Sequence, residues 1–128
     1  MQTNELNLTT TIPVQGTFDI AQGRNTIRTK IAMQHWPVTF AFYARATTTL
    51  TALGEIILLL DKSRSMCIQL IFFNCEPRCG IELSCRLPKT AQTASSWDVK
   101  VANLKRAADE LDIHESPSHL EIQARIWL

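Results

Sequence analysis

Cysteine and histidine are the residues of this sequence that most readily suggest chemistry. The chain holds four cysteines and three histidines: Cys67, Cys75, Cys79, Cys85, His35, His114 and His119. The cysteines form no Cys-x-x-Cys pair and the histidines have no complementary ligand spacing, so the pattern does not favour a zinc site. Cys75 and Cys79 instead bracket Glu76-Pro77-Arg78, which is typical of a hairpin turn. Small, buried or half-buried strand positions are the better interpretation of these thiols.

Other reactive or nucleic-acid-binding patterns are weak. The chain contains no Gly-x-Ser-x-Gly elbow to present a nucleophilic serine and no Gly-x-x-x-x-Gly-Lys loop to hold a phosphate. Thirteen basic residues balance twelve acidic ones, which leaves a formal net charge of +1. Trp36, Trp97 and Trp127 lie at the ends of predicted elements without basic residues between them, which favours core packing over base stacking. Nucleic acid is therefore not an expected partner.

Length and composition predict one folded domain over residues 1–128. Apolar residues make up 45% of the 128 positions and charged residues 20%, and a chain of this size buries roughly two-thirds of its unfolded surface without disulfides or metal. The longest apolar run, residues 56–60, is far shorter than the roughly 20 residues that span a bilayer. Residues 1–11 are polar and unlike a signal peptide. We expect a cytoplasmic protein with reduced thiols and no membrane association.

The first half of the chain is predicted to form one strand and two helices. Residues 6–12 alternate as in a strand, which is expected to end at Pro13. Asp19 can cap a helix that ends before Trp36-Pro37. The apolar positions of this helix are Ile20, Gly23, Ile27 and Ile31. A second helix is predicted for residues 39–60, although the threonine-rich residues 47–51 also suit a strand. The inner side of the second helix is Phe42, Tyr43, Ala46, Leu50, Leu53, Ile57 and Leu60.

The second half is predicted to begin with a hairpin of two strands, residues 67–74 and 79–87. A loop over residues 89–96 precedes a third helix over residues 97–111. The last strand alternates apolar and polar positions from Leu120 to Ile126. This order predicts an α+β fold: a two-layer sandwich in which three helices back a mostly antiparallel sheet of four to five strands.

Three stretches of the chain together resemble a known superfamily. Ile12-Pro13-Val14, followed by Asp19-Ile20-x-x-Gly23-Arg24-Asn25-x-Ile27-Arg28, is similar to its first strand and helix. Leu50-Thr51-Ala52-Leu53-Gly54-Glu55 resembles the run into its catalytic box, and residues 104–113 resemble the helix after its nucleotide lid. The superfamily is that of the GHKL (Bergerat-fold) ATPases, nearest the small serine-kinase anti-sigma factors of bacterial partner switching. The resemblance implies a histidine-kinase-like ATPase fold.

The sequence departs from this superfamily at the nucleotide site. Glu55 matches the carboxylate that activates the attacking hydroxyl, but Leu59 stands where an asparagine would ligate Mg²⁺ one helical turn later, and an isobutyl group offers no oxygen. The next box of the superfamily has an aspartate that accepts a hydrogen bond from adenine, and here that position is Cys85, a weak acceptor. The glycines of that box let the backbone approach the nucleotide closely, and here those positions are Leu87 and Lys89. Residues 90–101 contain no glycine for a phosphate nest. Lys89 and Lys100 are interpreted as solvated surface lysines.

These departures predict a regulatory protein that binds neither ATP and Mg²⁺ nor another cofactor. The resemblance implies that such a protein docks on a sigma factor, a STAS-domain antagonist or a phosphatase. It also implies a docking arginine early in the first helix, where Arg24 stands, with Arg28 farther out on the same exposed flank. Two alternatives remain open: an active ATP-dependent serine-protein kinase with atypical motifs, and a homodimer whose interface replaces the lost pocket.

Overall fold

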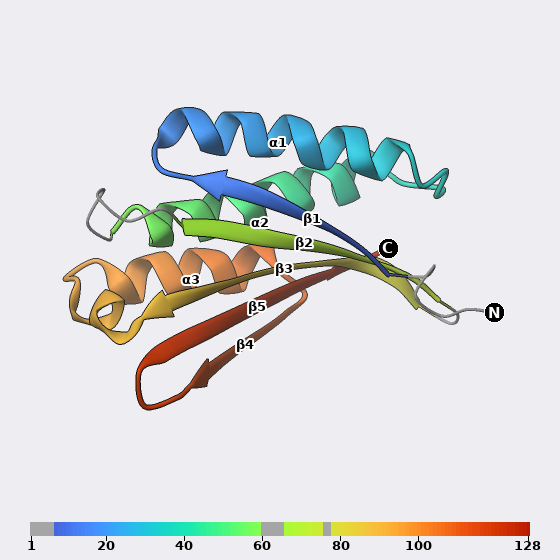
Figure 1. Cartoon of the computed structure of the whole chain (residues 1–128). Helices are drawn as coiled ribbons and strands as arrows, with labels where there is room; N and C mark the ends of the chain where they lie inside the picture. The colour runs from blue at the N-terminus through green and yellow to red at the C-terminus, as the bar shows by residue number, and fades with distance from the viewer. Residues whose placement is uncertain (1–6, 60–65, 76–77) are drawn as a thin grey trace.

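The computed structural model describes residues 7–59, 66–75 and 78–128 of the chain and places them in two layers (Figure 1). The described elements follow one another as one strand, two helices, two strands, a short 3₁₀ helix, a third helix and two further strands. Their bounds are β1 (Asn7–Val14), α1 (Thr17–Ala32), α2 (Phe40–Ile57), β2 (Met66–Cys75), β3 (Arg78–Pro88), the 3₁₀ helix η2 (Lys89–Thr93), α3 (Trp97–Ala107), β4 (Glu110–Glu115) and β5 (His119–Trp127). Leu6 and Leu60, which the sequence places in the first strand and second helix, lie outside the described residues.

The strands form one sheet in the order β1-β2-β3-β5-β4, with β1 and β4 at its edges. Every pairing among the strands that the structure describes is antiparallel. Strand β1 continues through Pro13 to Val14, so the prediction that it ends at Pro13 is wrong. Pro13 lies opposite Cys67 on an edge strand, where a proline need not donate a hydrogen bond to the ladder.

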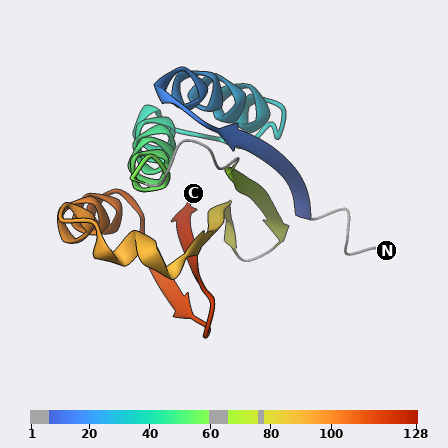
Figure 2. The same ribbon diagram turned by 60° about the vertical axis from the view of Figure 1, so that its left-hand side comes forward.

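The helices all cover one face of the sheet, as the two views show (Figures 1 and 2). Strand β5 illustrates how the sequence selects that face, because its buried side chains alternate with half-buried ones along the strand. The buried set is Leu120, Ile122, Ala124 and Ile126. Strand β3 likewise buries Ile81, Leu83, Cys85 and Leu87. The predicted two-layer α+β sandwich, with three helices behind an antiparallel sheet, is confirmed.

Helix α1 buries the stripe that its sequence predicts, but it begins earlier than predicted. The buried residues are Ile20, Gly23, Ile27 and Ile31. Gly16 is the N-cap, so the capping role predicted for Asp19 is wrong. Asp19 lies in the first turn, where its Oδ2 atom accepts a hydrogen bond from the backbone N–H of Gln15 at 2.7 Å. A carboxylate in the first turn also interacts favourably with the positive end of the helix dipole.

Two glycines allow α1 and α2 to pack closely. A Cβ atom added at Gly23 would lie 2.8 Å from Leu50 Cδ2 on α2. A Cβ atom added at Gly54 on α2 would lie 2.8 Å from Ile20 Cδ1 on α1. Each helix therefore presents a glycine to an aliphatic side chain of the other, which brings the two backbones together over the sheet.

Helix α2 includes the threonine-rich segment, which excludes a strand there. Thr39 is its N-cap and accepts a hydrogen bond from the Phe42 N–H at 3.1 Å. The Oγ1 atoms of Thr47, Thr49 and Thr51 donate to backbone carbonyls one turn earlier, at 3.0, 2.7 and 2.9 Å. These bonds satisfy hydroxyls that would otherwise compete with the helix. Of the predicted inner residues, Phe42, Ala46, Leu50, Leu53 and Ile57 are buried.

The third helix is shorter than predicted, and a strand takes its last residues. Helix α3 ends at Ala107, and β4 begins at Glu110, although the helical pattern extends to Leu111. Asp109 holds this change of direction: its backbone N–H donates to the Arg125 carbonyl at 2.8 Å, and its carboxylate accepts from the Trp127 N–H at 2.7 Å. Arg45 on α2 forms an ion pair with the same carboxylate. Contacts distant in sequence therefore end the helix.

Candidate functional site

Glu55, the predicted catalytic residue, lies half-buried on α2 beside α3. Its Oε1 atom is 3.3 Å from the Nζ atom of Lys100 on α3. Lys100 is therefore a partner of Glu55 rather than the solvated lysine that the sequence suggests. This ion pair joins the two helices at one end of a cavity and neutralises the carboxylate that the resemblance marks as catalytic.

The cavity between α2 and α3 has a volume of about 360 Å³. It is lined by Thr48, Thr51, Ala52 and Glu55 from α2 and by Asn103, Arg106 and Ala107 from α3. We call this set the helix groove. Its walls combine hydroxyls, an amide and a guanidinium with small apolar side chains. Thr48 and Arg106 are exposed, so the groove opens to solvent between the two helices.

The four residues predicted for the nucleotide pocket have different environments in the structure. Cys85 and Leu87 point from β3 into the core, with 4% and 1% of their surface exposed. Leu59 is half-buried beyond the end of α2. The Lys89 Nζ atom lies 3.4 Å from Glu115 Oε1, so this lysine pairs with the end of β4. Burial, reinforced by the charges of Cys67 and Glu121, raises the pKa of the Cys85 thiol to about 12.

These residues do not fit Mg-ATP. The residue that the resemblance aligns with the adenine acceptor is a buried, protonated thiol, Cys85, and the residue that it aligns with the close backbone approach is Leu87, packed in the core. Glu55 is the one oxygen donor among the predicted site residues and already binds Lys100. Among the residues that the structure describes, no group of three or more His, Cys, Asp or Glu side chains could hold a metal ion.

Arg24 and Arg28, the predicted partner-binding residues, have different environments on α1. The Arg24 Nη1 atom donates to Thr51 Oγ1 at 3.2 Å, so this half-buried arginine crosses to α2 and adjoins the helix groove. Arg28 is exposed, and its Nη1 atom contacts Asn25 Oδ1 at 3.4 Å on its own helix. The structure thus associates Arg24, but not Arg28, with the groove.

Asn103 and Arg106 of the groove were not identified from the sequence. They lie on the side of α3 that carries Lys100 and Ala107, which the spacing of three, six and seven residues places on one helical face. The helical pattern of α3 could therefore have marked them as one set. The helical spacing does not indicate that Asn103 and Arg106 face Thr48 and Glu55 of α2.

No protein-family model matches the chain, and no curated protein matches it. Within residues 7–59, 66–75 and 78–128, no helix is long and apolar enough to cross a membrane.

Proposed function

We propose that this protein is a non-catalytic regulatory module that acts by docking on another protein through the outer face of its helix layer. The observation that supports the proposal is the environment of the residues that the resemblance aligns with a nucleotide site. Cys85 and Leu87 are part of the core, and Glu55 is paired with Lys100. These contacts support a chain that lacks the polar groups which, by the resemblance, would hold a nucleotide.

The docking surface that we propose is the helix groove with Arg24 beside it. Arg24 reaches the groove through Thr51, and Arg106 lines it from α3. The described acid in the groove, Glu55, is already neutralised by Lys100, so the surface has an excess of positive charge. Its partner should present carboxylates at the contact. By the resemblance, the partner is a sigma factor, a STAS-domain antagonist or a phosphatase, met in the cytoplasm.

The non-catalytic part of the proposal predicts that Mg-ATP does not stabilise the protein. A ligand present at about 100 times its Kd stabilises the folded state by roughly 2.7 kcal/mol, which for a chain of this length raises the melting temperature by roughly 10 °C. We expect no such shift in a thermal melt with millimolar Mg-ATP and no saturable heat in calorimetry. A saturable, magnesium-dependent shift would instead support the atypical serine-protein kinase.

The docking part predicts that Arg24→Glu weakens partner binding about a hundredfold, because it reverses the charge beside the groove and leaves partner carboxylates unpaired. The partner is first identified by crosslinking and mass spectrometry with the tagged wild-type chain in its native host. Its affinity for purified wild-type and variant chains is then measured by calorimetry.

Lys105→Glu is the matched control for this measurement. Lys105 is exposed on α3 and does not line the helix groove, so the same charge reversal there should change the affinity less than threefold, about 0.6 kcal/mol. Circular dichroism must show that both variants remain folded. Equal affinity of the Arg24→Glu variant and the wild type would exclude this face as the docking surface.

A further inference from the structure

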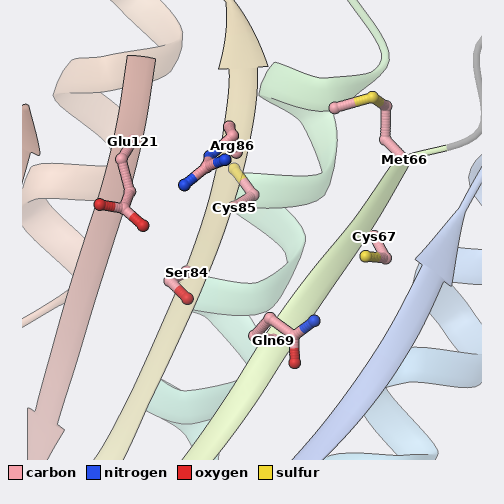
Figure 3. A pocket seen from close by; sticks show the side chains of 7 residues that line it. All are labelled: Met66, Cys67, Gln69, Ser84, Cys85, Arg86 and Glu121. Carbon is pink, nitrogen blue, oxygen red and sulfur yellow. The ribbon is translucent and has the colours of Figure 1, made fainter. Parts of the chain in front are cut away.

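The sheet opens between β2 and β3 near their ends. The β2–β3 ladder runs from the Cys75–Arg78 pair and ends at the Gln69–Ser84 pair. Beyond that pair, Met66 and Cys67 are paired with β1 alone, and residues 85–88 are paired with β5 alone. Figure 3 shows the two strands diverging there. Successive residues of an antiparallel strand direct their peptide groups to alternate sides, so both strands present backbone groups to the gap.

A cavity of about 340 Å³ lies at this opening. Its residues Ser84, Arg86 and Glu121 alternate along their strands with the buried core residues, so it opens on the sheet face opposite the helices. We call it the sheet hollow. Strand β2 contributes Met66, Cys67 and Gln69, strand β3 contributes Ser84, Cys85 and Arg86, and β5 contributes Glu121 (Figure 3). Its volume is within the range of small-molecule sites, about 300–1,000 Å³.

Three residues that line the sheet hollow carry sulfur. Met66 supplies a thioether, and Cys67 and Cys85 supply thiols. Cys85 is buried, and its raised pKa of about 12 keeps it protonated at neutral pH. Protonated thiols and thioethers behave as soft apolar groups. This lining suits an aliphatic or thioether side chain better than a charged group.

The rim of the sheet hollow carries one cation and one anion. Arg86 on β3 lies directly opposite Glu121 on β5, yet neither forms an ion pair with any residue that the structure describes. Four residues along the same two strands, Glu82 and Arg125 are also directly opposite and form an ion pair with an N–O distance of 3.0 Å. The geometry of these two strands therefore allows an ion pair between opposite residues, but Arg86 and Glu121 do not form one.

We propose that the sheet hollow binds a free α-amino acid with an apolar side chain. The ligand carboxylate binds the guanidinium of Arg86, whose paired N–H groups match a carboxylate. The ligand ammonium binds Glu121, and its side chain lies against the sulfur lining. Ser84 and Gln69 supply further hydrogen-bonding groups at the mouth. A ligand that is only an anion would meet Glu121, and one that is only a cation would meet Arg86, so the rim selects a zwitterion.

The test is calorimetric titration of the full chain with L-methionine and with L-leucine. We expect saturable binding with a Kd of about 1 mM or tighter for at least one of them. Methioninamide lacks the carboxylate and N-acetylmethionine lacks the ammonium, so each should bind about tenfold or more weakly than methionine. Absence of saturable binding by both amino acids, or equal binding of the blocked analogues, would overturn the proposal.

Two variants assign the ends of the ligand. Arg86→Gln should weaken methionine binding about tenfold and remove the preference for methionine over methioninamide. Glu121→Gln should weaken methionine binding by a similar factor and remove the preference for methionine over N-acetylmethionine. A variant that only disturbed the structure would weaken binding of methionine and of its blocked analogues alike, so the loss of one preference shows that the side chain recognises one end of the ligand. Arg28→Gln and Glu115→Gln, exposed and outside the hollow, are the controls and should bind like the wild type. Unchanged preferences in both hollow variants would also overturn the proposal.

Discussion

Replacing Arg125 by methionine is expected to lower the free energy of unfolding by about 3 kcal/mol at pH 7, which corresponds to the loss of one partner of a largely buried ion pair. The Arg125 Nε atom is 3.0 Å from Glu82 Oε1, and the two side chains are only 20% and 9% exposed. The same guanidinium donates to Asp112 Oδ2 at 2.8 Å and lies 3.5 Å from Glu110 Oε1. Methionine fills much of the space but leaves Glu82 charged and without this partner.

Denaturant unfolding at pH 7 measures this effect, with Arg28→Met as the control. Arg28 is exposed and forms a hydrogen bond with Asn25 on its own helix, so its loss should change stability by less than about 0.5 kcal/mol. Adding Glu82→Gln to Arg125→Met should recover part of the stability, because a neutral amide costs less to bury than a carboxylate. A loss below about 1 kcal/mol for Arg125→Met would show that water screens the pair as it does a surface pair.

The effect should also depend on pH in a defined direction. The hydrogen bond from Arg125 holds the pKa of Asp112 below its usual value. A carboxyl group whose pKa is lowered by folding contributes stability above its unfolded pKa and loses that contribution as the pH falls through its folded pKa. Removing Arg125 removes this contribution. The difference between wild type and variant is therefore expected to be largest near neutral pH and to shrink below about pH 4.

Replacing Gly80 by valine is expected to destabilise the protein by about 3 kcal/mol, the upper end of the usual cost of inserting atoms into a packed site. Gly80 lies on β3 opposite Trp127 of β5. A Cβ atom at this position would overlap the carbonyl oxygen of Ile126 and would lie 2.7 Å from Trp127 Cε3. The oxygen belongs to the backbone of β5, so it can move only if the ladder between the two strands distorts.

This result would oppose the intrinsic preference of the two residues, because valine favours strands and glycine weakens them. Gly80→Ala should already be destabilising, since its methyl group is the atom that overlaps. Gly16→Ala is the control: nothing lies within 4 Å of its added Cβ, and we expect a loss of at most about 1 kcal/mol, because alanine is a poorer N-cap than glycine. A valine variant as stable as the wild type would show that β3 and β5 separate without cost.

The sheet hollow and the helix groove lie in different layers of the molecule. The hollow opens on the sheet face opposite the helices, and the groove lies between α2 and α3. The two cavities share no lining residue. The test of amino-acid binding therefore stands apart from the test of docking, and either result can fail alone.

Local patterns in the sequence predict which side of each element faces the core. Alternation of period two placed Leu120, Ile122 and Ala124 on the inner face of β5, and helical spacing placed Ile20 and Ile27 on the inner side of α1. Burial of apolar surface decides which face of an element is turned inward, and the spacing of apolar residues along a few neighbouring positions already shows that face. For the same reason the architecture of a sheet backed by helices could be predicted.

The tertiary structure alone decided how distant residues meet. It ended α3 at Ala107 through the contacts of Asp109 with Trp127 and Arg45, although the local pattern continues as a helix. It placed Lys100 on Glu55 and Arg24 on Thr51, separated by 45 and 27 residues in the chain. Such contacts depend on strand order and helix packing. No local period encodes them, because a hydrogen bond or ion pair requires two groups within a few ångströms, whatever their separation in sequence.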